Sequence, residues 1–192
     1  MQVNAHEAEE ALASVDATMQ KVRRAVVDGG THYFFILWGI IWLFGFLGSH
    51  FFNERTAGFA WMVLTILGST SSAVIGVVQG RRVRKANAST TSRRIGLFWL
   101  TLFAYCSLVV WIARPLDGKQ SAMLIVIFAM LGWIAMGFLL SQSIIKFALL
   151  LTAVAFAGYY LLPNYFYLWM ALLGGGTMIG CGLYIHFRWR RS

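Results

Sequence analysis

The sequence has few charged residues and few cysteines, and each scarcity excludes a class of protein. Only 12% of its 192 residues are charged and 59% are hydrophobic, whereas soluble domains average about 25% charged residues. A soluble fold of this composition would lack the polar residues to cover its surface, so a lipid bilayer is the expected solvent. The two cysteines, Cys106 and Cys181, lie in apolar runs without CxxC spacing, which argues against a disulfide framework or a zinc site.

Acidic residues are absent from every long apolar run. The seven acids are Glu7, Glu9, Glu10, Asp16, Asp28, Glu54 and Asp117. Proton-coupled carriers usually need an ionisable group inside the membrane. The sequence also lacks a nucleophile triad, an HExxH motif and a glycine-rich phosphate loop. We therefore predict that the protein is not an enzyme and carries no cofactor.

Six apolar runs are each long enough to cross about 30 Å of hydrocarbon, which takes roughly 20 helical residues. They cover residues 32–52, 57–79, 95–113, 121–141, 144–162 and 166–187. Because backbone groups in lipid must be paired within their own segment, each run is expected to be helical. The predicted fold is all-α, with a bundle of six transmembrane helices in residues 31–192 and a cytoplasmic amphipathic helix in residues 1–30.

Basic residues gather at one end of the predicted spans. That end holds Lys21, Arg23, Arg24, Arg81, Arg82, Arg84, Lys85, Arg93, Arg94, Lys146, Arg188, Arg190 and Arg191, and the other end holds Arg55, Arg114 and Lys119. The positive-inside rule therefore predicts a multi-pass protein of the plasma (inner) membrane with cytoplasmic N- and C-termini. The net charge of +9 is assigned to anionic lipids of the inner leaflet rather than to nucleic acid.

The segment before the first span carries a heptad stripe. Its apolar positions alternate at intervals of three and four, and the candidate partner face consists of Leu12, Val15, Met19, Val22 and Val26. One interpretation is a helix lying on the membrane or against the bundle. The other is a short coiled coil with sister chains or a cytosolic partner. Asp28-Gly29-Gly30 is expected to end this helix, and Thr31 to cap the next.

Small residues recur at every fourth position in two spans. They are Gly68, Ser72, Gly76 and Gly80 in the second span, and Gly176 and Gly180 in the sixth. Such stripes let helices approach closely in lipid. We interpret these residues as a helix-packing seam, and we expect a homo-oligomer or a partner within a membrane complex.

Hydroxyl groups beside this seam offer a second interpretation. Ser69 and Thr70 lie near the middle of the second span, and together with Tyr105 and Trp133 they form a possible intramembrane polar site. Thr70 points roughly opposite to the seam, where its hydroxyl can bond back to the carbonyl of Ile66. A small-molecule binding or transport protein with an uncharged site is therefore the alternative to a non-catalytic scaffold or accessory subunit.

Two histidines are expected at the same membrane depth. His32 opens the first span and His186 ends the sixth. Two imidazoles at one depth can share a metal or respond to pH, but a closed metal site normally needs more ligands. No metal site is predicted, and His32 and His186 are the weak candidates for one.

Six spans in under two hundred residues, with both ends inside, resemble the substrate-binding subunits of vitamin-uptake ECF transporters and small HdeD-like membrane proteins. The first group usually has an AxxxA face on its first helix, but the first span here, "HYFFILWGIIWLFGFLGSHFF", has no alanine. The second group repeats prolines at hairpin ends, whereas this chain has only Pro115 and Pro163. Neither resemblance extends to particular residues, so the sequence assigns no family.

Overall fold

The computed structural model describes residues 30–82, 88–140 and 142–188. The predicted N-terminal helix, with its partner face, lies outside the described residues. The described elements are α2 (Thr31–Phe51), α3 (Glu54–Arg82), α4 (Ala88–Ile112), α5 (Gly118–Leu140), α6 (Gln142–Leu161), α7 (Phe166–Trp169), the π-helical segment η1 (Met170–Gly175) and α8 (Gly176–Arg188).

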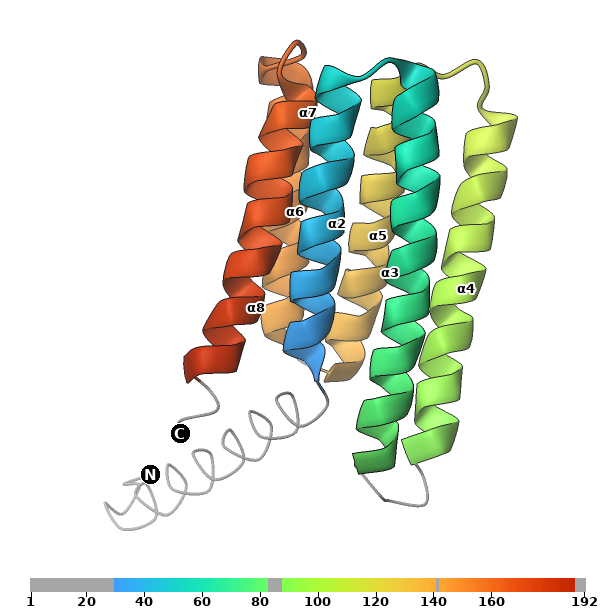
Figure 1. Cartoon of the computed structure of the whole chain (residues 1–192), viewed down its shortest axis with the longest axis vertical. Helices are drawn as coiled ribbons and strands as arrows, with labels where there is room; N and C mark the ends of the chain where they lie inside the picture. Colours follow the sequence, from blue (N-terminus) through green and yellow to red (C-terminus); the bar gives the residue numbers. More distant parts are fainter. Residues whose placement is uncertain (1–29, 83–87, 141, 189–192) are drawn as a thin grey trace, which may run out of the picture.

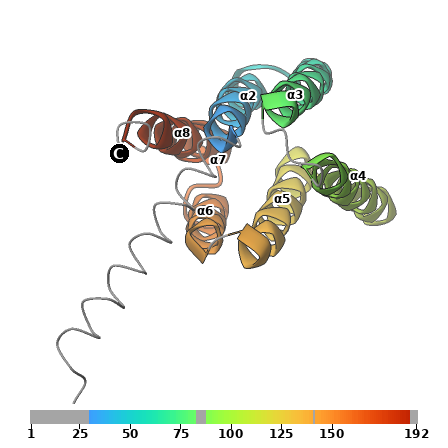
Figure 2. The same cartoon turned by 90° about the horizontal axis from the view of Figure 1, so that it is seen from below.

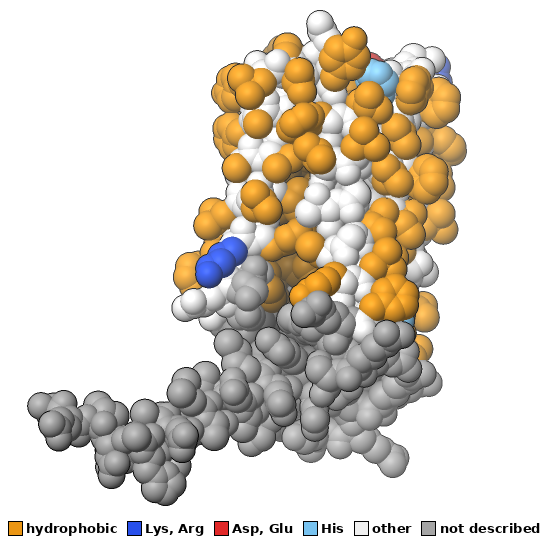
Figure 3. Space-filling view, turned by 90° about the vertical axis from the view of Figure 1, so that its left-hand side faces the viewer, with side chains coloured by type: hydrophobic (Ala, Val, Ile, Leu, Met, Phe, Trp, Pro, Cys, Tyr) orange, Lys and Arg blue, Asp and Glu red, His pale blue; other side chains and the backbone are white. Residues whose placement is uncertain are grey.

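Six helical stretches among the described residues are long and apolar enough to cross a membrane, with α7, η1 and α8 together forming the sixth. This finding confirms the predicted all-α bundle of six spans. Hydrophobic side chains are spread over the face of the bundle that Figure 3 shows. A surface of this kind is suited to lipid, because lipid tails are as apolar as the side chains that they cover.

The helices stand side by side and alternate in direction (Figure 1). We call the end at which α2 begins and α8 ends the lower end, as it is drawn in Figure 1, and the opposite end the upper end. Viewed from the lower end, the helices form two rows, α8–α2–α3 and α6–α5–α4 (Figure 2). The closest helix pairs are α2 with α8 in one row and α5 with α6 in the other.

Several helix limits differ from those expected. The third run was expected from residue 95, but α4 begins at Ala88, because a helix can continue through polar residues once it leaves the hydrocarbon. The prediction that Thr31 caps the first span is wrong. The cap is Gly30, with a φ of 69° and no side-chain hydrogen bond to the helix end. Glycine adopts this left-handed conformation without the steric cost that a Cβ imposes.

The core lies between the two rows of helices. Its largest fully buried side chains come from α5, α6, α7, η1 and α8, and they are Phe166, Met130, Leu151, Met170, Met178 and Val126. Phe35, Trp42 and Phe46 of α2 belong to the same buried cluster. No residue of α3 or α4 belongs to the buried members of this cluster, so these two helices lie at its periphery.

Glycines bring the backbones of α2 and the last span together. A Cβ added to Gly175 would lie 2.7 Å from the Leu43 amide nitrogen and 2.8 Å from the Gly39 carbonyl oxygen. One added to Gly182 would lie 2.9 Å from the carbonyl oxygen of His32. Gly175 ends the π-helical segment, where the sequence had predicted one uninterrupted helix. The last span therefore packs closely on α2 because its glycines have no side chains and because the helix type changes locally.

A tryptophan ring packs over a glycine in each of the three consecutive helix pairs. A Cβ on Gly45 of α2 would lie 2.6 Å from the ring of Trp61 in α3, and one on Gly132 of α5 would lie 2.7 Å from the ring of Trp99 in α4. Gly158 of α6 is likewise covered by the ring of Trp169. The indole N–H of Trp169 donates to the carbonyl of Val154 at 2.9 Å.

Candidate functional site

The helices α3 and α4 are far less buried than the other spans. In the most apolar window of each, 6% of the residues are buried, against 22% to 39% in the other four spans. Each uses a single stripe of residues to reach its neighbour, and most of its remaining circumference is exposed. Large apolar residues point outward from both helices, among them Ile66, Leu67, Leu100 and Trp111.

Two residues of the predicted seam lie where α3 meets α2. A Cβ on Gly68 would collide with the side chain of Ile41, and Gly68 is buried. The hydroxyl of Ser72 accepts a hydrogen bond of 3.2 Å from the indole N–H of Trp38. In lipid such a bond between helices contributes about 0.6 kcal/mol on average.

The other predicted seam residues are placed differently. Gly76, Gly176 and Gly180 have no atom of another element within 4 Å of an added Cβ, and Gly80 lies in the last turn of α3. The last span makes its close contacts through Gly175, opposite Gly39 and Leu43, and through Gly182, opposite His32 and Ile36. Gly39, Gly175 and Gly182 were not singled out from the sequence. Gly175 and Gly182 are seven residues apart, a spacing that indicates one packing face, but the four-residue spacing of Gly176 and Gly180 indicates another.

The possible polar site is not gathered into one place. Ser69 and Thr70 are exposed on α3, and Tyr105 is 63% exposed on α4. Trp133 instead lies inside the bundle, with ring centroids 5.0 Å from Phe35 and 5.6 Å from Trp99. These aromatic contacts connect α2, α5 and α4, so Trp133 serves to dock α4.

The Thr70 hydroxyl does not make the expected bond to the carbonyl of Ile66, nor any other hydrogen bond to the described part of the chain. Ser107 and Thr152 show what such a bond looks like here. Their hydroxyls donate at 2.8 Å to the carbonyls of Phe103 and Ala148, four residues earlier. The hydroxyl of Thr70 is thus available for a bond to another molecule.

Small side chains form a line on the outward side of α3. Thr65, Ser69 and Ala73 are four residues apart and all are exposed. Successive positions four apart lie on the same side of a helix. We call these three residues, together with Thr70 beside them, the outer face of α3.

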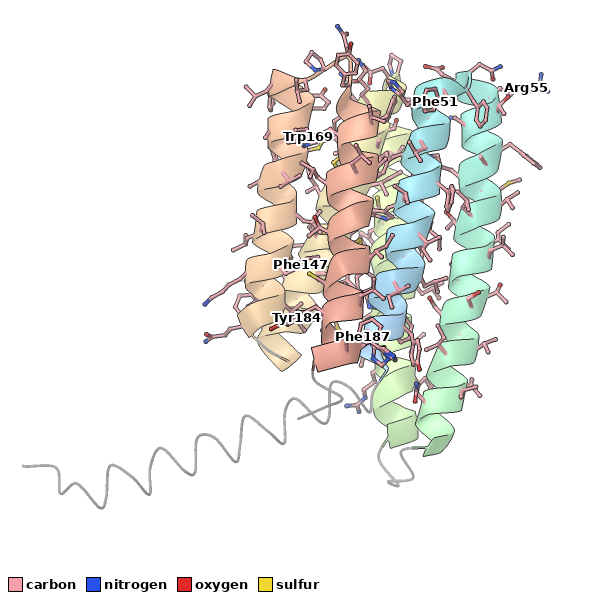
Figure 4. All side chains as sticks on the ribbon, turned by 60° about the vertical axis from the view of Figure 1, so that its left-hand side comes forward. Phe51, Arg55, Phe147, Trp169, Tyr184 and Phe187 are labelled. Carbon is pink, nitrogen blue, oxygen red and sulfur yellow. The ribbon has the colours of Figure 1, made fainter. Side chains whose placement is uncertain are left out.

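The two predicted histidines meet at the lower end. The ring centroids of His32 and His186 are 5.0 Å apart, and Tyr33 packs beside them at 4.0 Å from His32 and 6.4 Å from His186. Figure 4 shows Tyr184 and Phe187, which flank His186 in sequence, at the lower end of α8. No group of three or more metal-binding side chains occurs within the described residues.

Comparisons of the chain with family models, with curated proteins and with solved structures found no match.

Proposed function

We propose that the chain is a non-catalytic integral membrane protein, an oligomeric scaffold or an accessory subunit of a membrane complex. The observation that carries this proposal is the low burial of α3 and α4. The helix at one end of each row, α3 in one and α4 in the other, is left exposed, while the opposite side holds a dense core. The outer face of α3 is the surface through which we expect the chain to associate.

The residue types on this face support association between helices. Lipid tails offer no hydrophobic drive, so helices associate through close packing and interhelical hydrogen bonds. Ser69 and Ala73 allow close approach because their side chains are small, and Thr70 brings a hydroxyl without a partner in the described chain. A second helix would supply both the packing surface and the hydrogen-bond partner.

The distribution of charge supports an orientation in the plasma membrane. Arg93, Arg94 and Lys146 are exposed near the lower end, whereas Arg55 and Arg114 are exposed near the upper end. Together with the basic residues outside the described ranges, they favour a cytoplasmic lower end that contacts anionic lipids. Both termini would then be cytoplasmic.

The transport alternative gains no support from this arrangement. It requires Ser69, Thr70, Tyr105 and Trp133 to line one cavity, but three of them point outward from the bundle and Trp133 is engaged in aromatic packing.

Bulky residues on the outer face of α3 test the proposal. Ser69→Phe and Ala73→Phe should lower the mass of the detergent-solubilised complex and stop a tagged copy from co-purifying an untagged partner. Ala153→Phe is the matched control, because Ala153 is a small, exposed residue of α6 on the better-buried side. An assembly that survives both α3 substitutions, or a wild-type chain that is monomeric without partners, would refute it.

The second proposed contact is the heptad stripe in residues 1–30. Removing residues 1–27 should also reduce the mass of the complex if the stripe pairs with sister chains or a cytosolic partner. If it lies on the membrane instead, the mass of the complex is unchanged.

A further inference from the structure

The inference concerns the histidine pair at the lower end, which plays no part in the proposed association. His32 lies in the first turn of α2 and is 4% exposed, although histidine is usually only partly buried. His186 lies on α8 and is half-buried. These residues are 154 positions apart in the chain, and the fold brings their rings to a centroid distance of 5.0 Å.

The backbones of α2 and α8 hold the rings of His32 and His186 in a fixed relative position. Gly182 sets the backbone of α8 against the carbonyl oxygen of His32, where an added Cβ would come within 2.9 Å, and against Ile36 of the next turn. Because no side chain separates the helices at this point, the ends of α2 and α8 cannot slide apart without losing the contact. The ring of Tyr33 covers His32 on one side. The two histidines are therefore held in place at the contact between α2 and α8.

The ring spacing suits a shared metal ion. A tetrahedral ion bound about 2.0–2.1 Å from one nitrogen of each imidazole holds the ring centres roughly 5 Å apart. The centroid distance does not depend on which way either ring is flipped, so it is the appropriate quantity to compare. Imidazole nitrogen suits Zn²⁺, Cu²⁺ and Ni²⁺, whereas Mg²⁺ and Ca²⁺ prefer oxygen ligands.

We propose that His32 and His186 form a binding site for a transition-metal ion such as Cu²⁺ or Zn²⁺ at the lower end of the α2–α8 pair. The two imidazoles supply two ligands. Both ring nitrogens of His32 are buried, so the water that completes the coordination sphere reaches the ion from the side of the half-buried His186. Two protein ligands make the ion exchangeable. When it is bound, the ion joins the first span of the bundle to the last.

Copper binding to the full-length, untagged chain in detergent tests the site. Wild type should bind one equivalent of Cu²⁺, with electron paramagnetic resonance showing two imidazole nitrogens on the ion. His186→Gln should weaken binding at least about tenfold, since even the loss of a partner that merely orients a ligand costs 10–100-fold. Zn²⁺ should raise the thermal midpoint of wild type but not that of His186→Gln, because an ion that binds only the folded state stabilises it.

Two other histidines provide matched controls. His50 lies at the upper end, where its ring packs against Phe51, and His6 lies outside the described residues. His50→Gln and His6→Gln should both leave the copper spectrum unchanged. The proposal fails if His186→Gln binds copper as wild type does, if wild type binds no ion, or if His6→Gln or His50→Gln removes the site. His186 is half-buried, so its substitution keeps the test decisive even if a variant at the more buried His32 does not fold.

Discussion

Gly175 and Gly176 are neighbours with opposite surroundings. A Cβ on Gly175 would meet the backbone of Leu43 at 2.7 Å, whereas one on Gly176 has nothing within 4 Å. Backbone atoms cannot turn aside as the end of a flexible side chain can. The helix pair α2–α8 must therefore separate to accept any side chain at Gly175.

Gly175→Ala should accordingly destabilise the bundle, by about 1–3 kcal/mol if it behaves like other overpacked cores. Gly176→Ala should be neutral or slightly stabilising, since alanine is the better helix former by about 1 kcal/mol. Thermal unfolding in detergent compares the two. Equal midpoints for both variants would contradict the close contact.

Ser49 connects two helices through one hydroxyl. It accepts a hydrogen bond of 2.8 Å from the indole N–H of Trp61 and donates one of 3.0 Å to the carbonyl of Gly45. Ser49→Ala would leave the indole N–H without this partner, and we expect a loss of about 0.6–1.7 kcal/mol in stability. Ser107→Ala is the control, because the Ser107 hydroxyl bonds only within its own helix. Its stability should be unchanged in the same thermal measurement.

At the scale of the element, α4 depends on aromatic contacts for its position. Trp99 packs over Gly132 and against the ring of Trp133, and Trp133 in turn stacks on Phe35 of α2. The contact of α4 with α3 is slight by comparison. A helix held by so few side chains is expected to open locally before the bundle unfolds.

Trp99→Ala should release α4, because an aromatic pair contributes about 0.5–1.5 kcal/mol beyond its burial. Hydrogen exchange should become faster in α4 while exchange in α2 and α8 is unaffected. Trp111→Ala is the control on the same helix. Trp111 is 65% exposed, so hydrogen exchange in this variant should match that of wild type. Faster exchange in both variants would show that any loss of a tryptophan loosens α4.

The elements themselves could be predicted more fully than their contacts. The lengths of the apolar runs identified all six spans, because crossing a bilayer requires a long apolar helix. The choice of packing glycines could not be made in the same way. Glycines at 174, 175, 176, 180 and 182 compete on one helix, and the pattern alone favoured Gly176 and Gly180. The structure packs Gly175 and Gly182 against α2, because the π-helical segment changes the facing of the turns that follow it.

At the scale of the whole molecule, the two acids within the described residues lie at the same end of the bundle. Glu54 begins α3 and Asp117 lies in the α4–α5 connection, both at the upper end. The contact between the two histidines at the lower end could not be predicted from the sequence. The sequence placed both rings at one depth, but only the packing of α8 on α2 shows that they are neighbours, since helix order around a bundle is not encoded in span lengths.

The orientation of the whole molecule can be tested with thiol labelling. In a chain with both native cysteines replaced by serine, Asn164→Cys in the upper α6–α7 turn should react with a membrane-impermeant reagent on intact cells. Arg94→Cys near the lower end should react only after lysis. Both Asn164 and Arg94 are exposed, so access across the membrane alone separates them. Reversed labelling would place the termini outside.

The π-helical segment has a consequence for the rest of the last span. A π turn holds about one residue more than an α turn, and one residue corresponds to about 100° of rotation along an α-helix. Deleting Leu172 or Leu173, which are both exposed, would remove the residue that the wide turn accommodates, so the segment could close as ordinary α-helix without turning the part that follows. Rewinding all six residues of η1 as α-helix with no deletion would instead add about one residue's worth of rotation. The part of the last span that follows η1 would then rotate about the helix axis by about a quarter of a turn. Gly182 would leave the groove beside Ile36, and His186 would swing away from His32. The six residues of η1 therefore determine which side of α8 faces α2.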